Sequence, residues 1–165
     1  MLDVGCGPGV NLRALQAAVG EDGTVVAVDY SRGMIRKARA RVADHGWNNV
    51  TVTRADATTA DLGGPYDAAI ATLSLSVMPD VERTVRNVFD SMAPGGRLGV
   101  LDIRPVPHGP ARLLNPLLRA FLRWYANWNS TGDVPGSIEE VFGAFEEFER
   151  AMAGTTYAGL ARKPA

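Results

Sequence analysis

The residues that could carry chemistry begin with three glycines near the start of the chain, Gly5, Gly7 and Gly9, in the run LDVGCGPG. The run stands between a short apolar stretch and a helical pattern, so it predicts a strand-to-helix turn. Glycines at alternate positions let the backbone turn sharply and approach a ligand closely. The helix that follows offers free N–H groups and a partial positive charge. Taken alone, the run fits nucleotide-binding turns of several kinds and also a plain tight turn.

Two acidic residues follow predicted strands farther along the chain. Asp29 ends the second predicted strand, 20 residues after Gly9, where a carboxylate can accept hydrogen bonds from two ribose hydroxyls. By itself such a carboxylate is more often a helix cap. Asp56 follows the third predicted strand, where it could accept a hydrogen bond from an exocyclic adenine amine. Because open parallel sheets bind ligands at the carboxyl ends of their strands, these elements together predict one nucleotide site.

The spacing of these residues discriminates between nucleotides. The glycines are spaced GxGxG, whereas dinucleotide-binding turns are spaced GxGxxG. Asp3, two residues before the first glycine, suits a cationic amino-acid end better than a pyrophosphate. No Walker lysine follows the glycines, which argues against a nucleoside triphosphate.

The composition is that of an ordinary globular domain. The 165 residues are 46% hydrophobic and carry a formal net charge of −1, so no global field would attract nucleic acid. Cys6 is the only cysteine and the two histidines, His45 and His108, are far apart, so we expect neither an intrachain disulfide nor a metal site. No apolar run reaches the roughly 18 residues of a membrane span, and no signal sequence is present. We therefore expect a cytoplasmic protein.

The elements that position these residues alternate between apolar strands and amphipathic helices, which indicates a parallel sheet covered on both faces. The predicted strands are residues 2–4, 24–29, 49–54, 66–73 and 97–103. The predicted helices are residues 10–19, a helix capped by Ser31, residues 80–92, which 93–96 should end, and residues 137–145. Strands 146–152 and 155–162 should form a terminal hairpin and complete a single domain, residues 1–165.

Five stretches, in the expected order, resemble the Rossmann-like S-adenosylmethionine-dependent methyltransferases, and most nearly the ubiquinone/menaquinone-biosynthesis type. They are LDVGCGPG (2–9), VVAVDYS with Met34 (25–34), RADA (54–57), YDAAIATLSLSVMPD (66–80) and APGGRLGVLDIRP (93–105). The resemblance covers most of the first 105 residues. It implies an α/β fold with a Rossmann-like, doubly wound, mostly parallel sheet and a C-terminal antiparallel hairpin, whose last strand is inserted into the sheet.

The resemblance also implies the cofactor S-adenosyl-L-methionine. The implied cofactor-binding residues are Asp3, Gly5, Cys6, Gly7, Gly9, Asp29, Tyr30, Met34, Asp56, Ala57 and Leu73. The glycine turn would approach the methionine part, with Asp3 hydrogen-bonding near its amino group and Leu73 beside the methionyl end. Asp29 would hold the ribose.

The adenine would then lie farther along the same edge of the sheet. By resemblance, Tyr30 and Met34 would pack on the adenine ring, and Asp56 with Ala57 would contact its edge. Cys6 lies in the glycine turn, where a nucleophilic role is not expected.

Two departures from the family pattern bear on function. The chain starts within the first strand, whereas relatives carry several upstream helices that help close the substrate pocket. We expect either a minimal version of the domain or an incomplete start. Many relatives have one or two histidines within 75–80, where Ser76 and Val77 stand here. No base is carried over, so the catalytic residues are unassigned, and the nearest titratable candidates are His108, for which a plain loop role is expected, and Tyr125.

The segment 111–128 is aromatic and arginine-rich, with a wide apolar face at helical spacing. Its apolar residues are Leu113, Leu114, Leu117, Leu118, Phe121, Leu122, Trp124, Tyr125 and Trp128. We expect this helix to face the core. The alternatives are that it roofs an apolar acceptor pocket, or makes a peripheral membrane contact with Arg112, Arg119 and Arg123 outward.

The leading hypothesis is methyl transfer to a small-molecule acceptor, with a lipophilic quinone precursor as the example. The protein must mainly align the acceptor with the methyl group and exclude water. One alternative is a nicotinamide-dependent oxidoreductase, against which the glycine spacing and the lack of a Tyr-xxx-Lys pair count. The other is a non-catalytic cofactor-binding domain that has lost its acceptor site. No basic patch with interleaved aromatics supports a nucleic-acid partner.

Overall fold

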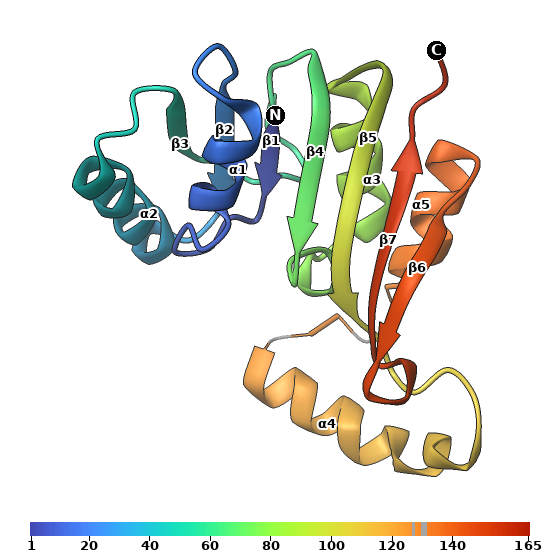
Figure 1. Ribbon diagram of the computed structural model, residues 1–165. Helices are drawn as coiled ribbons and strands as arrows, with labels where there is room; N and C mark the ends of the chain where they lie inside the picture. The colour runs from blue at the N-terminus through green and yellow to red at the C-terminus, as the bar shows by residue number, and fades with distance from the viewer. Residues whose placement is uncertain (127, 130–131) are drawn as a thin grey trace.

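The computed structural model describes residues 1–126, 128–129 and 132–165, and a seven-stranded sheet runs through it (Figure 1). The strand order is β3-β2-β1-β4-β5-β7-β6. The strands are β1 (Leu2–Val4), β2 (Val25–Asp29), β3 (Val50–Arg54), β4 (Tyr66–Thr72), β5 (Met92–Ile103), β6 (Glu146–Ala151) and β7 (Thr156–Arg162). Strands β1 to β5 pair in parallel, and β7 lies antiparallel between β5 and β6. The predicted mostly parallel sheet with an inserted last strand is confirmed.

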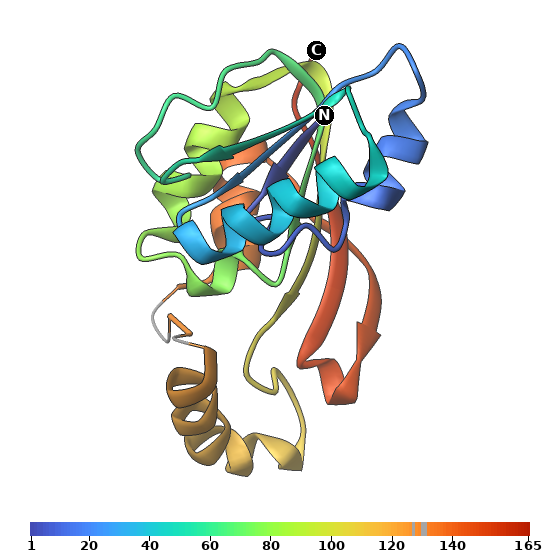
Figure 2. The same cartoon turned by 90° about the vertical axis from the view of Figure 1, so that its left-hand side faces the viewer.

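Helices cover both faces of this sheet, as the turned view shows (Figure 2). On one face α1 (Leu12–Val19) and α2 (Arg32–His45) pack against β2 and β3. On the other face α3 (Val81–Asp90) and α5 (Val134–Phe142) pack against β1, β4 and β5. Each fully buried aliphatic side chain in these two layers, such as Val85, contributes about 1.5–3 kcal/mol.

Local sequence sets where these helices begin and end. The Ser31 hydroxyl accepts a hydrogen bond from the Met34 N–H at 3.4 Å, which confirms the predicted cap of α2. Gly46 ends the same helix in a left-handed conformation, which glycine adopts without steric cost. At the start of α3 the Asp80 carboxylate accepts a hydrogen bond from the Arg83 N–H at 3.0 Å.

Several predicted boundaries are wrong. The first helix begins at Leu12 rather than at residue 10, because the glycine turn continues that far. Residues 93–96 do not end a helix but lie inside β5, since β5 already pairs with β4 at Met92 and the Gly95 N–H donates to the Lys163 carbonyl. The helix predicted at 137–145 is α5, which starts earlier because the Asp133 carboxylate caps it.

One further helix, α4 (Asn115–Ala126), projects beyond the carboxyl end of the sheet, preceded by the short 3-10 helix η2 (Pro110–Leu114) (Figures 1 and 2). The prediction that this helix faces the core is wrong, since Leu113 and Trp124 are 85% and 82% exposed. Among the apolar residues of 111–128 whose burial the structure describes, Trp128 is the buried one. An apolar stripe at helical spacing does not specify its partner surface, and here the helix extends past the end of the sheet.

The strand order reverses at β1, which has β2 on one side and β4 on the other. Open α/β sheets bind their ligands outside the carboxyl ends of the strands at such a reversal. The glycine turn follows β1, Asp29 ends β2, and the 3-10 helix η1 (Leu75–Val77) follows β4. The fold therefore brings the residues predicted for a nucleotide site to one edge of the sheet.

Candidate functional site

The glycine run forms the turn between β1 and α1, and each of its glycines has a left-handed backbone. The φ angles of Gly5, Gly7 and Gly9 are +68°, +54° and +79°, which other residues rarely adopt. A Cβ on Gly5 would lie 2.5 Å from the Ser74 Cβ, and one on Gly9 would lie 2.7 Å from the Leu12 Cδ1. A Cβ on Gly7 would meet no atom within 4 Å. Gly5 and Gly9 therefore allow close packing, whereas Gly7 leaves its backbone open to a ligand.

The Asp29 carboxylate joins this turn to the end of β2. Its Oδ2 accepts a hydrogen bond from the Gly7 N–H at 2.9 Å, and its Oδ1 accepts one from the Ser31 N–H at 2.8 Å. Asp29 thus organises the backbone around it, as a carboxylate at the end of a strand often does. Each carboxylate oxygen can accept a further hydrogen bond, so the residue can also receive ribose hydroxyls.

Asp3 is a buried carboxylate in the central strand β1. It is 0% exposed, and neither of its oxygens has a hydrogen-bond partner among the described residues. Burial, with a smaller contribution from the charge of Asp29, raises the pKa of Asp3 to about 6, against an opposing effect of the nearby Asn11 amide. The Asn11 amide donates to the Thr72 Oγ1 at 3.1 Å and makes no hydrogen bond to Asp3. A buried carboxylate without a partner lowers the free energy of unfolding by on the order of a few kcal/mol. A cationic or hydrogen-bond-donating group of a ligand would offset that loss.

These elements border a cavity of about 810 Å³. Nine of the eleven predicted site residues line it, namely Gly5, Cys6, Gly7, Asp29, Tyr30, Met34, Asp56, Ala57 and Leu73. The other two, Asp3 and Gly9, are not among the lining residues, because Asp3 is fully buried in β1 and Gly9 packs between α1 and α2. The volume is in the range of small-molecule sites, which run to about 1,000 Å³.

At one end of the cavity, exposed apolar side chains stand beside an acid. Tyr30 is 68% exposed and Met34 is 37% exposed, which leaves two surfaces on which a flat ring can pack. The Arg54 guanidinium lies 5.3 Å from the centre of the Tyr30 ring and donates to the Tyr30 carbonyl, which fixes that residue. The Asp56 Oδ1 accepts a hydrogen bond from the Thr58 N–H at 2.9 Å. This arrangement suits a purine base with an exocyclic amine.

Leu73 lies at the end of β4 in a conformation that is unusual for its residue type. Its φ is +51°, which costs an L-residue roughly 1–2 kcal/mol. The Leu73 N–H donates to the Leu101 carbonyl at 2.7 Å and holds the strained turn in place. The side chain is 54% exposed and lines the cavity, where the resemblance expects the methionyl end of the cofactor.

Several residues that were not predicted from the sequence line the same cavity, among them Asn11, Ser74 and Met78. Asn11 stands two residues after the glycine run, at the N-cap of α1, where asparagine is common, so its position carried a signal. Ser74 carried none. Its hydroxyl donates to the Val4 carbonyl at 2.7 Å, a contact between residues 70 positions apart.

Among the described residues, no histidine or lysine lines the cavity, whose ionisable residues are Cys6, Tyr30 and two aspartates that already accept hydrogen bonds from backbone N–H groups, Asp29 and Asp56. Burial raises the pKa of the Cys6 thiol to about 12, so Cys6 is a neutral packing residue at neutral pH. His108 is exposed and does not line the cavity. The Tyr125 side chain lies outside the described part of the structure.

Ser76 and Val77, which stand where many relatives have histidines, both belong to η1. The Ser76 N–H and hydroxyl both donate to the buried Asp102 carboxylate, so this serine is held in the protein interior. Within residues 1–126, 128–129 and 132–165, no cluster of three His, Cys, Asp or Glu side chains could hold a metal ion. In the same residues, no helix has the length and apolar character needed to cross a membrane.

A doubly wound sheet with a glycine turn after its first strand and a cavity at the strand-order reversal defines the Rossmann-like α/β class. Residues 1–96 match a family model described as a methyltransferase domain. The chain belongs to this methyltransferase domain family. The family implies S-adenosylmethionine as the cofactor.

Relatives with known names agree with this assignment. The nocamycin O-methyltransferase of Saccharothrix syringae is 34% identical over 118 residues, which are 71% of this chain and 42% of the relative. The ubiquinone/menaquinone biosynthesis C-methyltransferase UbiE of Yersinia enterocolitica is 31% identical over 123 residues, 73% of this chain and 47% of the relative. The aklanonic acid methyltransferase DauC of a Streptomyces species is 30% identical over 99 residues, 59% of this chain and 45% of the relative. The chain thus spans less than half the length of these curated relatives.

Solved structures share the fold over nearly the whole chain. The YcgJ protein of Bacillus subtilis superposes with a TM-score of 0.81 at 15% identity, covering 99% of this chain and 91% of its own. An S-adenosylmethionine-dependent methyltransferase from Mesorhizobium loti gives a TM-score of 0.70 at 20% identity, covering 98% and 89% of the two chains. At these identities the likeness establishes the fold, and it confirms the Rossmann-like prediction.

Proposed function

We propose that this chain binds S-adenosylmethionine in the cavity of about 810 Å³ and transfers its methyl group to a small-molecule acceptor. The observation that carries the proposal is Asp3, a fully buried carboxylate without a partner that precedes the glycine turn by two residues. The cofactor brings an ammonium group and a sulfonium group, and either cation would stabilise the ionised carboxylate. A pyrophosphate of a dinucleotide would be repelled there.

The residues present fit this cofactor. Gly7, where a Cβ would meet no protein atom, leaves backbone open to the amino-acid part. Asp29 keeps acceptor capacity for ribose hydroxyls, and Asp56 would accept a hydrogen bond from the adenine amine. Tyr30 and Met34 would pack on the adenine ring. In this proposal residues 1–165 form a single methyltransferase domain.

The bound cofactor supplies a methyl group that is already activated, because its departure leaves a neutral thioether. The residues of this chain would then bind and orient the two reactants and exclude water from between them. Leu73, Val77 and Met78 give the methyl end of the cavity an apolar wall. This wall favours a lipophilic acceptor, as do relatives named for nocamycin, aklanonic acid and quinone biosynthesis.

The test is a calorimetric titration of the chain with S-adenosylhomocysteine, which carries the ammonium group and the nucleoside. Asp29→Ala should weaken binding by at least about tenfold, because charge-assisted hydrogen bonds contribute roughly 1.5–3 kcal/mol. Asp44→Ala, an exposed acid in α2, is the matched control and should bind like the parent.

Three further outcomes are decisive. A folded parent that binds no S-adenosylhomocysteine would overturn the proposal. Preferential binding of NADH would support the nicotinamide alternative instead. Binding of S-adenosylhomocysteine without its formation from S-adenosylmethionine, in the presence of quinol and phenol acceptors, would favour a non-catalytic cofactor-binding domain.

A further inference from the structure

A second cavity, of about 280 Å³, lies beside the carboxyl end of β5 and the first residues of β7. It is bordered by η1, by the segment after β5, by the η2–α4 arm and by the start of α5. The two cavities share η1 as a wall, because Val77 lines the first and its neighbour Ser76 lines the second. Molecules bound in the two cavities would therefore contact neighbouring residues of η1.

Tyr157 provides an unsatisfied hydrogen-bonding group in this second cavity. The residue is 1% exposed and lines the cavity, and its hydroxyl has no hydrogen-bond partner among the described residues. Burial, together with the charge of Asp102, raises the pKa of Tyr157, so its hydroxyl stays protonated and available as a donor. A buried hydroxyl without a partner is costly, and an acceptor oxygen from a ligand would remove that cost.

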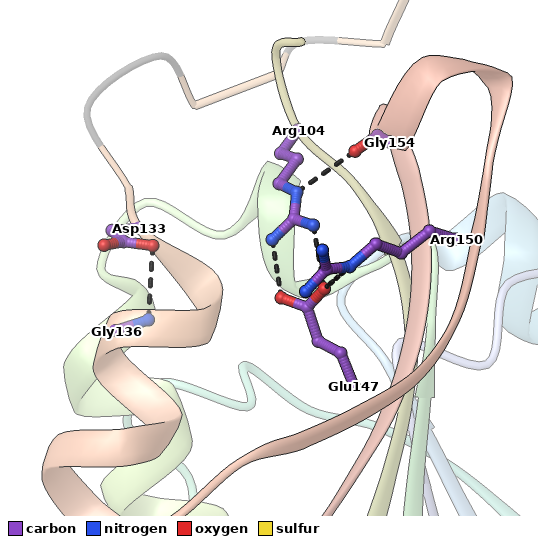
Figure 3. Close-up of polar contacts among 6 residues, drawn as sticks. All are labelled: Arg104, Asp133, Gly136, Glu147, Arg150 and Gly154. Atoms are coloured by element: carbon purple, nitrogen blue, oxygen red, sulfur yellow. Dashed lines mark hydrogen bonds and ion pairs between the residues drawn. The ribbon is translucent and has the colours of Figure 1, made fainter. Parts of the chain in front are cut away.

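The cation nearest to Tyr157 is already neutralised. The Arg104 guanidinium lies 4.7 Å from the centre of the Tyr157 ring. It binds the Glu147 carboxylate through two hydrogen bonds of 2.6 and 2.8 Å, and its Nε donates to the Gly154 carbonyl (Figure 3). Arg104 thus forms a fixed wall of the cavity and contributes little net charge.

The remaining charges of the lining favour an anion. Arg112 and Arg119 reach the cavity from the η2–α4 arm, and the described residues show no ion pair for either. The opposing acid is Asp133, whose carboxylate accepts a hydrogen bond from the Gly136 N–H (Figure 3). Asp102 lies beneath the lining, where its oxygens accept hydrogen bonds from Ser76 and from the next residue of the chain. Among the lining residues alone, and with Arg104 paired to Glu147, the arginines exceed the one acid by a single positive charge, which matches a monoanion.

The rest of the lining is apolar and includes Val106, Trp128, Val134 and Pro135. A ligand that fits this cavity must therefore combine an apolar body with one acidic group. We propose that this cavity binds a carboxylate carried by an apolar molecule, and that this carboxylate is the end of the methyl acceptor remote from the transferred methyl group. The second half of this inference rests on the proposed function, because only a methyltransferase has a methyl acceptor.

Benzoate is the probe, and benzyl alcohol is its neutral counterpart. The chain should bind benzoate, and benzyl alcohol should bind at least about tenfold more weakly, since a charge-assisted pair is lost. Arg112→Gln and Arg119→Gln should each weaken benzoate binding several-fold. Arg123→Gln, on α4 like Arg119 but outside the cavity lining, is the matched control and should change nothing.

Tyr157→Phe tests the hydroxyl separately from the arginines. The variant keeps the ring that packs against Arg104 and loses only an unpartnered hydroxyl, so the melting temperature should be retained while benzoate binding weakens. Unchanged benzoate affinity in both Arg119→Gln and Tyr157→Phe would overturn the proposal. Tighter binding of inorganic phosphate than of benzoate would show that the ligand class is wrong.

A titration with both ligands separates this inference from the proposed function. Benzoate should bind equally well in the presence of saturating S-adenosylhomocysteine, and competition between the two would place benzoate in the first cavity and overturn the proposal. Benzoate binding by a chain that does not bind S-adenosylhomocysteine would preserve the carboxylate site, but it would overturn the proposed function and the assignment to a methyl acceptor.

Discussion

The Gly7 N–H donates to the Asp29 Oδ2 at 2.9 Å, which ties the turn after β1 to the end of the neighbouring strand β2. The second oxygen of the same carboxylate holds the Ser31 N–H at the start of α2. A single side chain thus fixes two of the backbone segments that border the cavity. The shape of the site depends on this carboxylate even before any ligand is bound.

Replacing this carboxylate should therefore affect stability as well as binding. Asp29→Asn replaces one acceptor oxygen with an NH₂ group that faces a backbone N–H. We expect the free energy of unfolding to fall by about 1–2 kcal/mol, within the range for hydrogen bonds to charged groups. Urea unfolding followed by tryptophan fluorescence measures the change, with Asp44→Asn as the control. Equal unfolding midpoints for the two variants would contradict this role.

Two glycines of the turn, Gly5 and Gly7, should respond differently to alanine. Gly5→Ala would place a Cβ 2.5 Å from the Ser74 Cβ at a φ of +68°, so it should destabilise the fold by more than the roughly 1–2 kcal/mol of a left-handed alanine. Gly7→Ala has the same backbone cost without the clash, and its methyl group would protrude toward the cavity. Gly5→Ala should thus lose more stability, whereas Gly7→Ala should lose affinity for S-adenosylhomocysteine while remaining folded. Equal urea midpoints for the two variants would contradict the first expectation, and unchanged affinity of Gly7→Ala would contradict the second.

Asp3 should make stability depend on pH below neutrality. Its pKa is about 6 in the folded protein and about 3.9 in an unfolded chain, so between these values the folded state binds more protons. The contribution of Asp3 to the free energy of unfolding therefore decreases as pH rises from about 4 to about 6, by on the order of 3 kcal/mol. Unfolding of the parent and of Asp3→Asn across this range measures the effect, and the two curves should converge toward low pH. Parallel curves would contradict the burial of an unpartnered carboxyl group.

Ligand binding should show the opposite dependence on pH. An ammonium group beside Asp3 favours the ionised carboxylate, so the affinity for S-adenosylhomocysteine should rise between pH 5 and pH 7. Asp3→Asn has no charge to gain and should bind weakly with a flat profile. Calorimetry at both pH values provides the comparison, and a flat profile in the parent would argue against Asp3 as the ammonium partner.

Two salt bridges of different exposure should contribute very differently to stability. In the Arg104–Glu147 pair the side chains are 20% and 12% exposed and the contact has two hydrogen bonds, whereas in Arg86–Glu82 they are 55% and 51% exposed. Glu147→Gln should cost about 1–3 kcal/mol and Glu82→Gln less than about 0.5 kcal/mol. The Arg104 guanidinium lowers the pKa of Glu147, so the contribution of this pair is present at neutral pH and is lost as pH falls through the folded-state value. Urea unfolding of both variants at neutral pH measures the two losses of free energy of unfolding, and equal losses would contradict the prediction.

Local patterns, together with the family resemblance, were sufficient to predict the fold and nine of the residues that line the cavity. The apolar strands, the glycine turn and the acids at the ends of β2 and β3 each carry their signal within a few residues. Parallel pairing then brings those strand ends to one edge, which is why nine predicted residues line a single cavity. Long-range contacts carry no such signal, and Ser74, whose partner is Val4, was therefore missed.

The position of helix α4 was also not predictable from the sequence. Its apolar residues recur with the period of a core helix, yet Leu117 and Trp124 are 73% and 82% exposed. Periodicity reports which face of a helix is apolar and not what covers that face. The unsatisfied hydroxyl of Tyr157 could not be predicted from the sequence either. The residues around it come from η1, the end of β5, the η2–α4 arm and the start of α5, which are far from Tyr157 in the sequence.

The insertion of β7 between β5 and β6 has a consequence for biosynthesis. Ribosomes make the chain from its N-terminus, so the edge of β5, with its apolar Leu98 and Val100, stays unpaired until the last strand has been translated. An open apolar edge is a template for aggregation, whereas the strand that finally forms the outer edge, β6, carries the charged residues Glu146, Glu147, Glu149 and Arg150. A nascent chain that stalls before residue 156 thus leaves one edge of β5 unpaired, and translation through Arg162 allows β7 to cover it and leaves the charged strand β6 at the outer edge.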